Sequence, residues 1–199
     1  MAEFAGRHPD ARVELHEFGL PDPSAGLAGG STDVAFIRLP SATHGLAITP
    51  LFTEPCVVGV SAAHPMSRRE RVRVADLLDE PIAIGRTDDG VWRDFWTLAG
   101  HRPGKRARNV VETHSQREEG EVVAAGMACS VTPAAARRHS PHPGVRFITI
   151  GDHPGSVVAV AHRSGGTNPL VASFVDSAVV VRDRETQILH TIEGAPEAG

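Results

Sequence analysis

The stretch from Ser31 to Arg38 constrains the fold more than any other part of the chain. Its apolar run follows two glycines and ends before Leu39-Pro40, which is typical of a strand buried on both faces of a parallel sheet. Ligands of open α/β sheets lie beyond the carboxyl ends of the strands, and a guanidinium placed there can hold an anion. Arg38 is therefore the first candidate for a ligand contact. The alternative is a surface arginine that only ends a strand.

The segments before this strand predict a strand, a helix and a second strand in succession. Residues 1–8 place apolar side chains on one helical face, and the helix ends at His8 because proline disfavours helical geometry in the residue before it. Residues 11–18 alternate at a period of two, which is typical of a strand. A short helix is expected over 24–28. This order favours parallel pairing of residues 11–18 with the 31–38 strand.

The rest of the chain alternates apolar runs with helical patterns, which indicates an α/β fold. Phe52 to Pro55 has mixed polarity and predicts the first crossing between two lobes. Trp92, Phe95 and Trp96 share one helical face, which favours a core role over a cofactor site. Strands are expected over 46–52, 56–61, 81–84, 109–112, 128–131, 145–150 and 157–161. Helices are expected over 74–78, 116–125, 134–138 and 169–181, and another is expected to begin at residue 91. A mobile tail is expected after residue 183.

The helix expected over 116–125 begins with a recognisable cap. Ser115 is followed three residues later by Glu118, the pattern of a capping box. The amino end of such a helix carries free N–H groups and a partial positive charge, so it is a second candidate place for an anionic ligand. An ordinary capped surface helix is the alternative.

Composition limits the classes of function. The chain has 199 residues, 41% of them hydrophobic, and a formal net charge of -4, which argues against a dedicated nucleic-acid-binding surface. Acidic residues interleave with the arginines at 68, 69, 71 and 73, so these are expected to form a solvated face. No apolar run is long enough to span a membrane and no signal peptide is apparent. The cytoplasm is the expected location.

Other motifs predict neither metal nor cofactor chemistry. Cys56 and Cys129 lie in apolar runs, where free thiols are usually buried, and no disulfide is expected. His139 and His142 lie in a proline-broken loop without a third ligand at metal-binding spacing. The Gly59 to Ala63 sequence lacks the second glycine of a nucleophile elbow, and neither a phosphate loop nor a dinucleotide motif is present. We therefore expect no metal, no cofactor and no enzymatic activity.

Several phrases at fixed relative positions resemble the effector-binding domain of LysR-type transcriptional regulators. Each phrase is weak alone, but their order and spacing cover nearly the whole chain. They are Phe4 and Arg7-His8-Pro9-Asp10 with Val13-Glu14-Leu15; Leu27, Gly30 and Asp33-Val34-Ala35-Phe36; Pro50-Leu51, Glu54, Val58-Gly59-Val60 and His64-Pro65; Asp76-Leu77; Val123-Ala124-Ala125-Gly126 through Val131-Thr132-Pro133; and Val158-Ala159-Val160 with Arg163.

The resemblance implies an α/β fold of two Rossmann-like lobes with central mixed sheets, joined by two crossing strands as in type II periplasmic solute-binding proteins. Lobe I would hold residues 1–53 and 162–185 and lobe II residues 54–161, with 186–199 as a flexible tail. Members of the family open this domain with a strand before the first helix, whereas this sequence starts inside that helix. The first strand of lobe I is therefore expected to be missing, which would leave an exposed pairing edge.

The resemblance also implies where a ligand would bind. Arg38 matches a residue that contacts the ligand carboxylate in some members, and Leu20 stands where those members have a hydroxyl residue. Residues 85–88 match the cleft-facing loop of lobe II. Asp88 in this loop could instead select a cationic group, which leaves the charge of the ligand open. The candidate ligand-binding residues are Leu20, Arg38, Arg86, Thr87, His114 and Ser115.

The function that the resemblance implies is ligand sensing in transcription regulation. A small effector, an organic acid or an aromatic compound, would bind in the interlobe cleft and change the arrangement of a homodimer or homotetramer. DNA would be bound through an amino-terminal helix-turn-helix that these residues do not include, and contact with RNA polymerase would belong to the full-length regulator. A free-standing solute-binding protein of the same fold is the main alternative, and an enzyme is a weaker one.

Overall fold

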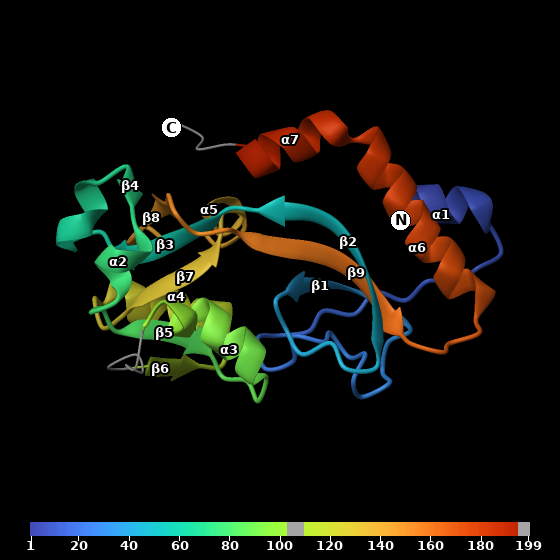
Figure 1. The fold of residues 1–199 in the computed structure, drawn as a ribbon, viewed down its shortest axis with the longest axis horizontal. Coiled ribbons are helices and arrows are strands. Elements are labelled where there is room, and N and C mark those ends of the chain that lie inside the picture. Colours follow the sequence, from blue (N-terminus) through green and yellow to red (C-terminus); the bar gives the residue numbers. More distant parts are fainter. Residues whose placement is uncertain (103–109, 195–199) are drawn as a thin grey trace.

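The computed structural model describes residues 1–102 and 110–194, which fold around two β-sheets. One sheet has three strands in the order β1-β9-β2, and the other has six strands in the order β4-β8-β3-β7-β5-β6. Figure 1 shows the two sheets side by side along the long axis of the molecule, with β2 and β9 extending from one toward the other. The mixed α/β fold with two sheets agrees with the expected fold class.

The three-stranded sheet is antiparallel throughout. β9 (Ser156–Arg163) is its central strand and pairs with β1 (Val34–Leu39) on one side and with β2 (Leu46–Glu54) on the other. Ala159, Ala161 and Ile37 pack with Leu27 in a small core beside it. Within the described residues β1 pairs with β9 alone, so its outer edge has no strand partner there.

The parallel pairing expected for residues 11–18 and 31–38 was wrong. Residues 11–18 form no strand, and residues 24–28 form turns instead of a helix. Leu15 is 80% exposed. Alternation of apolar and polar side chains is a local property, whereas a strand also requires a neighbour whose backbone groups can complete the ladder. β1 meets that requirement with β9, and residues 11–18 do not.

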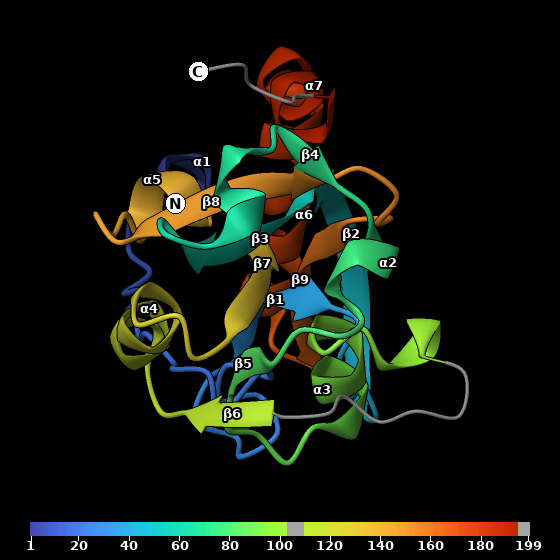
Figure 2. The ribbon, with the colours of Figure 1, turned by 90° about the vertical axis from the view of Figure 1, so that its left-hand side faces the viewer.

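The six-stranded sheet is mixed and lies between two layers of helices. β3 (Cys56–Ser61) pairs antiparallel with β7 (Cys129–Pro133) and β8 (Val145–Ile150). The parallel pairs join β4 (Arg71–Val72) to β8, and β5 (Ile82–Gly85) to both β6 (Val110–Thr113) and β7. In Figure 2, α4 (Gln116–Ala124) lies on one side of this sheet, and α2 (Val74–Leu77) and α3 (Gly90–Trp96) on the other. The short α5 (Ala136–His139) and the 3-10 helices Pro65–Arg68 and Ala99–His101 complete this part.

The largest core lies on the α2 and α3 side of the six-stranded sheet. It contains buried apolar residues from β3, β5, β7 and β8 together with Leu77 of α2 and Trp96 of α3. Trp92 and Phe95 pack against this core and are partly buried. The predicted core role of the aromatic stripe is therefore confirmed.

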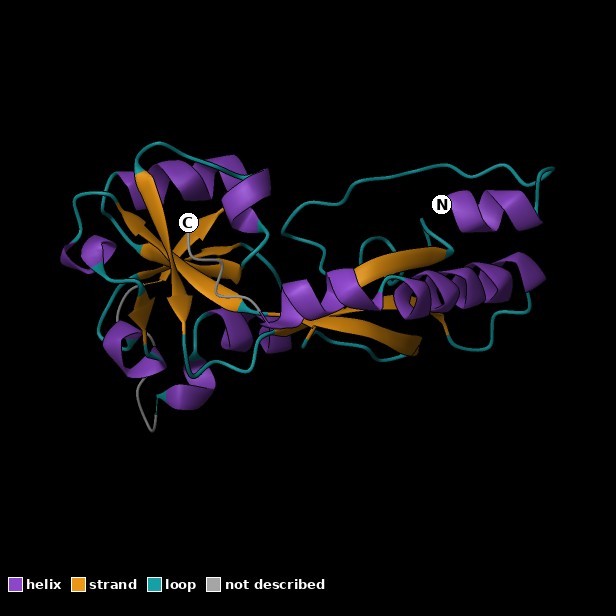
Figure 3. Ribbon diagram, turned by 90° about the horizontal axis from the view of Figure 1, so that it is seen from above, coloured by secondary structure: helices purple, strands orange, loops and turns teal. Residues whose placement is uncertain are grey.

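Two points on the chain connect the sheets. β2 ends at Glu54 in the three-stranded sheet, and after Pro55 the chain enters β3 of the six-stranded sheet. The return runs from β8 into β9. In the view of Figure 3 the same strands join the two halves of the molecule. The two halves are therefore joined through two neighbouring strand crossings.

Three helices pack beside the three-stranded sheet. α1 (Ala2–Arg7) contacts α6 (Pro169–Arg184), and α6 and α7 (Thr186–Gly194) both contact β2. The mobile tail expected after Asp183 is instead helical as far as Gly194, and residues 195–199 lie outside the described part. Leu189 of α7 lines an apolar groove with Phe52 of β2. The helix therefore gains apolar contacts that its sequence position alone does not reveal.

Candidate functional site

The candidate site lies where loops from the two halves of the molecule meet. Gly85 at the end of β5 pairs with Thr113 at the end of the parallel strand β6, so the loops that follow these strands leave the same edge of the sheet. The N–H of Arg86 donates to the carbonyl of Thr113 at 2.8 Å and continues this pairing by one residue. The carboxyl edge of a parallel sheet is where α/β proteins usually bind ligands.

Leu20 makes the closest approach across this junction. Its side chain lies directly over the backbone of Gly85 and occupies the space that a Cβ there would need. Gly85 is itself buried, so a glycine is required at this point by the close approach of the two halves. The predicted neighbours Leu20 and the 85–88 loop are thus in contact, and the contact is apolar.

Two hydrogen bonds tie the same loop to the other half of the molecule. The hydroxyl of Thr87 donates to the carbonyl of Pro21 at 3.4 Å, and the carboxylate of Asp89 accepts from the N–H of Ala42 at 2.7 Å. The other oxygen of Asp89 caps α3 by accepting from the N–H of Trp92 at 3.0 Å. Asp89 therefore couples the start of α3 to the loop after β1.

Arg38 lies at the end of β1, as expected, but its guanidinium is paired within the protein. It donates to Oε2 of Glu54 at 2.6 Å and to the hydroxyl of Ser156 at 3.0 Å. Glu54 is 4% exposed and its other oxygen accepts from the N–H of Ala135. The network joins the end of β1 to both crossing strands and to α5, so Arg38 holds the connection between the sheets.

His114 and Ser115 lie beside the 85–88 loop, at the start of α4. The hydroxyl of Ser115 accepts from the N–H of Glu118 at 3.1 Å and caps the helix. The carboxylate of Glu118 accepts from the N–H of His114 at 2.7 Å, not from Ser115 as a capping box requires. Glu118 and Glu119 thus bring negative charge to this helix end, which makes it a poorer site for an anion than the sequence predicts.

Two further features of the junction concern Ser41, which carries no clear signal in the sequence, and Arg86, which is a predicted ligand-binding residue. The hydroxyl of Ser41 is buried and has no hydrogen-bond partner among the described residues, although Ser41 immediately precedes Ala42 at the junction. A buried unsatisfied hydroxyl is unfavourable and is usually completed by water or a ligand. Arg86 is exposed and forms no ion pair with a described residue. Its charge contributes, after the larger effect of Arg93, to lowering the pKa of the nearby Glu112 carboxyl, but unlike Arg38 it is not held by a hydrogen-bonded carboxylate among the described residues.

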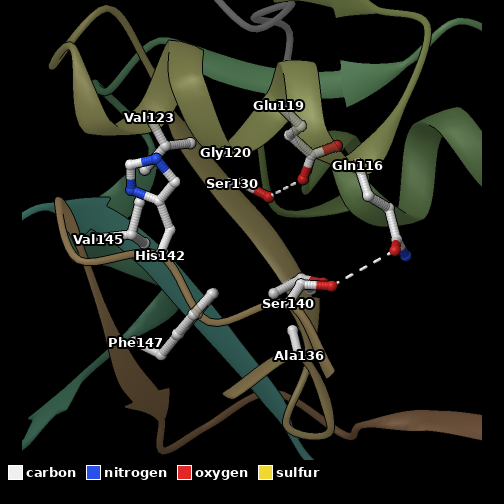
Figure 4. A pocket seen from close by; sticks show the side chains of 12 residues that line it. Gln116, Glu119, Gly120, Val123, Ser130, Ala136, Ser140, His142, Val145 and Phe147 are labelled. Atoms are coloured by element: carbon white, nitrogen blue, oxygen red, sulfur yellow. Dashed lines mark hydrogen bonds between the residues drawn. The ribbon is translucent and has the colours of Figure 1, made fainter. Parts of the chain in front are cut away.

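Two pockets lie away from this junction, one in each half. The first has a cavity volume of about 50 Å³ and lies between α4, α5 and the six-stranded sheet; Figure 4 shows the side chains around it. The second has a cavity volume of about 220 Å³ and lies between α1, α6, α7 and the three-stranded sheet, with Phe4, Phe36 and Phe174 in its lining. None of the six candidate residues lines either pocket.

The thiols and histidines show no arrangement for metal or redox chemistry in the described part of the chain. Cys56 and Cys129 are both free and buried. Burial raises the pKa of each thiol to about 12, so neither is a thiolate near neutral pH. Among residues 1–102 and 110–194, no group of three or more His, Cys, Asp or Glu side chains could hold a metal ion. None of the described helices is long and apolar enough to cross a membrane.

Comparison with known proteins identifies the relatives of the chain. It is 25% identical over 183 residues to the HTH-type transcriptional regulator AlsR of Bacillus subtilis, an alignment that covers 88% of this chain and 58% of AlsR. It is 26% identical over 179 residues to the DNA-binding transcriptional dual regulator OxyR of Escherichia coli, covering 88% of this chain and 57% of OxyR. The chain thus spans a little over half the length of these regulators.

Solved structures show the same fold. The effector-binding domain of BenM with its effector benzoate superposes with a TM-score of 0.68 and 22% identity, covering 92% of this chain and 84% of that chain. The effector-binding domain of QuiR in complex with shikimate gives a TM-score of 0.70 and 14% identity, covering 92% of this chain and 88% of that chain. At these identities the likeness establishes the fold of effector-binding domains, the type II periplasmic-binding-like fold.

The family model of the LysR substrate binding domain matches residues 1–180, most of the chain. The resemblance drawn from the sequence phrases is therefore confirmed. Together with the shared fold, this match shows that the chain belongs to the LysR substrate-binding domain family.

Proposed function

We propose that this chain is the ligand-sensing part of a transcription regulator and binds a small effector at the junction between its two sheets. One observation supports the location above the others. The buried hydroxyl of Ser41 has no hydrogen-bond partner among the described residues, and it lies at the junction where Leu20 meets Gly85 and Asp89 meets Ala42. A bound effector would supply the missing partner there. The site is a binding site, and we propose no catalytic step.

The proposed lobes follow the two sheets. The bounds expected from the sequence, residues 1–53 and 162–185 for lobe I and residues 54–161 for lobe II, cut through β9, which is the central strand of the three-stranded sheet. We therefore place all of β9 (Ser156–Arg163) in lobe I with the three-stranded sheet, and leave the six-stranded sheet in lobe II. The carboxyl ends of β1, β5 and β6 carry the loops that meet between them. An effector held by both lobes would change the angle between them, because only the two strand crossings connect the sheets.

The available charge favours an anionic effector. The guanidinium of Arg38 is occupied by the buried carboxylate of Glu54, whereas the guanidinium of Arg86 is exposed beside the junction. A guanidinium can bind a carboxylate with two parallel hydrogen bonds. We therefore assign recognition of a small carboxylate to Arg86, orientation to Thr87 and Ser41, and the apolar wall to Leu20.

Regulation of DNA binding would require the rest of the regulator. AlsR and OxyR are about 1.7 times as long as their alignment with this chain, because 58% and 57% of their lengths are covered. In our proposal a helix-turn-helix outside these residues binds DNA, homodimers or tetramers transmit the lobe movement, and RNA polymerase contacts belong to the full regulator in the cytoplasm. The 199 residues alone should not bind promoter DNA, which a gel-shift experiment tests.

A thermal-shift screen of small carboxylates tests the effector site. Benzoate and shikimate are sensible first compounds, because they are bound by the structurally similar BenM and QuiR domains. Binding to the folded state raises the melting temperature in a concentration-dependent way. For any compound that does so, Arg86→Ala should remove most of the shift, whereas Arg117→Ala, which removes an exposed arginine of α4, should not. Equal shifts in both variants would reject the assignment of Arg86.

A further inference from the structure

The pocket between α4, α5 and the six-stranded sheet has a feature that core packing does not explain. Two glycines contribute to its lining, Gly120 of α4 and Gly59 of β3. Glycine within a helix is destabilising relative to alanine. A Cβ at Gly120 would meet its nearest neighbour, Cδ2 of His142, at 3.8 Å, which is an ordinary contact. Gly120 is therefore not required by a close approach, and its effect is to leave the pocket open.

The pocket is polar at one end and apolar at the other. Figure 4 shows Glu119, Ser130 and Gln116 together on one side, with Phe147 and Val145 on the opposite side. The carboxylate of Glu119 accepts from the hydroxyl of Ser130. Oε1 of Glu119 is the oxygen that accepts from Ser130, which leaves Oε2 able to accept from water or from a polar molecule in this space.

The charge in the pocket is uncompensated. Of the twelve described residues that line it, Glu119 is the one carboxylate and none is a lysine or an arginine. His142, the other ionisable residue of the lining, accepts from the N–H of Gly144 through Nδ1 at 3.0 Å, and its Nε2 lies 3.6 Å from Glu121. The imidazole is thus oriented toward a different carboxylate. Burial raises the pKa of Glu119, as expected of a carboxyl group without a nearby cation.

We propose that this pocket is a second ligand site, distinct from the interlobe junction, and that it binds a small organic ammonium ion. Glu119 is the counter-ion, and the hydroxyl of Ser130 fixes the orientation of its carboxylate. The carbonyl oxygen of the Gln116 side chain, which accepts from the Ser140 hydroxyl at 3.4 Å, lies on the same side and can accept a second ammonium proton. Phe147 and Val145 contact the alkyl part of the ligand.

The proposal is tested by NMR titration of the full chain with three small molecules of similar length and different charge. The probes are propylammonium, 1-propanol and propionate, and the readout is the set of backbone amide shifts. Propylammonium should produce saturable shifts at Gly59, Gly120 and Ser130. 1-Propanol and propionate should bind at least tenfold more weakly at these positions, because neither carries a positive charge. Equal affinity for propylammonium and 1-propanol would overturn the assignment of a cation site.

Two variants separate the role of the carboxylate from the stability of the fold. Glu119→Gln keeps the shape of the side chain and can still accept from Ser130, so the fold should persist while affinity for propylammonium falls at least tenfold. Gly120→Ala places a methyl group in the pocket and improves the helix. It should raise the melting temperature and weaken propylammonium binding at the same time.

A matched control distinguishes this pocket from general attraction of a cation to an acidic surface. Glu121→Gln removes the neighbouring exposed carboxylate on α4 and should leave propylammonium affinity within twofold of the wild type. Undiminished binding in Glu119→Gln, or unchanged binding in Gly120→Ala, would contradict the proposal. So would a loss in Glu121→Gln as large as that in Glu119→Gln.

Discussion

At the scale of single residues, the sequence locates Arg38 correctly at the end of a strand, but the role it suggests changes in the structure. The guanidinium of Arg38 pairs with the carboxylate of Glu54, which is 4% exposed and also accepts from the N–H of Ala135. A carboxylate buried at a strand crossing requires a partner, and Arg38 supplies it. The sequence places these two residues sixteen positions apart and gives no direct sign of their pairing.

Arg38→Ala should therefore destabilise the protein as well as alter its ligand response. Removal of the guanidinium leaves a largely buried carboxylate without its cation, and we expect the free energy of unfolding to fall by about 2 kcal/mol. Denaturant unfolding measures the change. The double variant Arg38→Met with Glu54→Gln should lose less unfolding free energy than the sum of the losses in the single variants Arg38→Met and Glu54→Gln. A single variant as stable as the wild type would show that the pair contributes nothing.

The two cysteines should be unreactive in the native protein. Burial raises the pKa of Cys56 and of Cys129 to about 12, and only the thiolate reacts readily with disulfide reagents. Reaction with Ellman's reagent at pH 8 should be slow for both thiols in the folded protein and rapid for both after unfolding in guanidinium chloride. Fast titration of either thiol without denaturant would contradict the packing described here.

His153 should make stability depend on pH. Burial and the nearby charge of His101 lower the pKa of His153 to about 4 in the folded protein, whereas the unfolded value is about 6.5. Between pH 4 and pH 6.5 the unfolded chain binds more protons than the folded protein does, so stability is lost as the pH falls from 6.5 toward 4. His153→Asn keeps an acceptor for the N–H of Gly155, which Nδ1 of His153 provides at 3.2 Å. The melting temperature of this variant should depend less steeply on pH over that range.

At the scale of elements, most helices and strands agree with the sequence patterns because their signals are local. The core strand β3, the aromatic face of α3 and the Ser115 cap of α4 each follow from apolar spacing or from a capping residue. The errors occur where pairing or packing at long range decides the outcome. Residues 11–18 lack a strand partner, β1 pairs antiparallel with a strand more than one hundred residues away, and α7 packs on β2.

For the candidate site too, some residues could be predicted from the sequence and others could not. The resemblance places Leu20 and Thr87 in a cleft, and the structure brings both to one junction. Ser41 and Asp89 were missed, because an orphan hydroxyl and a hydrogen bond between distant loops leave no periodic pattern. The aspartate does have a local signal, since it precedes α3 as an N-cap residue, but that signal indicates a helix start and not a contact across the junction.

Asp89→Ala should weaken both the start of α3 and the contact between the loops. The carboxylate caps the helix through Trp92 and accepts from Ala42 of the other half, so the variant should lose about 1 to 2 kcal/mol of unfolding free energy. Hydrogen exchange should become faster at both the Trp92 and the Ala42 amides. Asp88→Ala, one residue earlier and exposed, is the control and should change neither rate. Faster exchange at Trp92 alone would show that the contact with Ala42 is unimportant.

At the scale of the whole molecule, two sheets are linked by two strand crossings and touch again through loops at 20–21, 40–42 and 85–89. Among the described residues, these loops meet through the contact of Leu20 with Gly85 and through two hydrogen bonds, from Thr87 to Pro21 and from Ala42 to Asp89. Such a contact is weak enough for a ligand to replace or extend it, because each hydrogen bond contributes only about 1 kcal/mol net. The architecture therefore suits a molecule that reports ligand binding by a change in the angle between its halves.

The most direct test of this account is a crystal structure of the chain with a compound that raises its melting temperature. The account predicts that the ligand lies between the 85–89 loop and the loops at 20–21 and 40–42, with its anionic group on Arg86 and a polar atom on the hydroxyl of Ser41. A ligand bound instead in the apolar groove beside Phe36 and Phe174, with the junction unchanged, would contradict the proposed effector site.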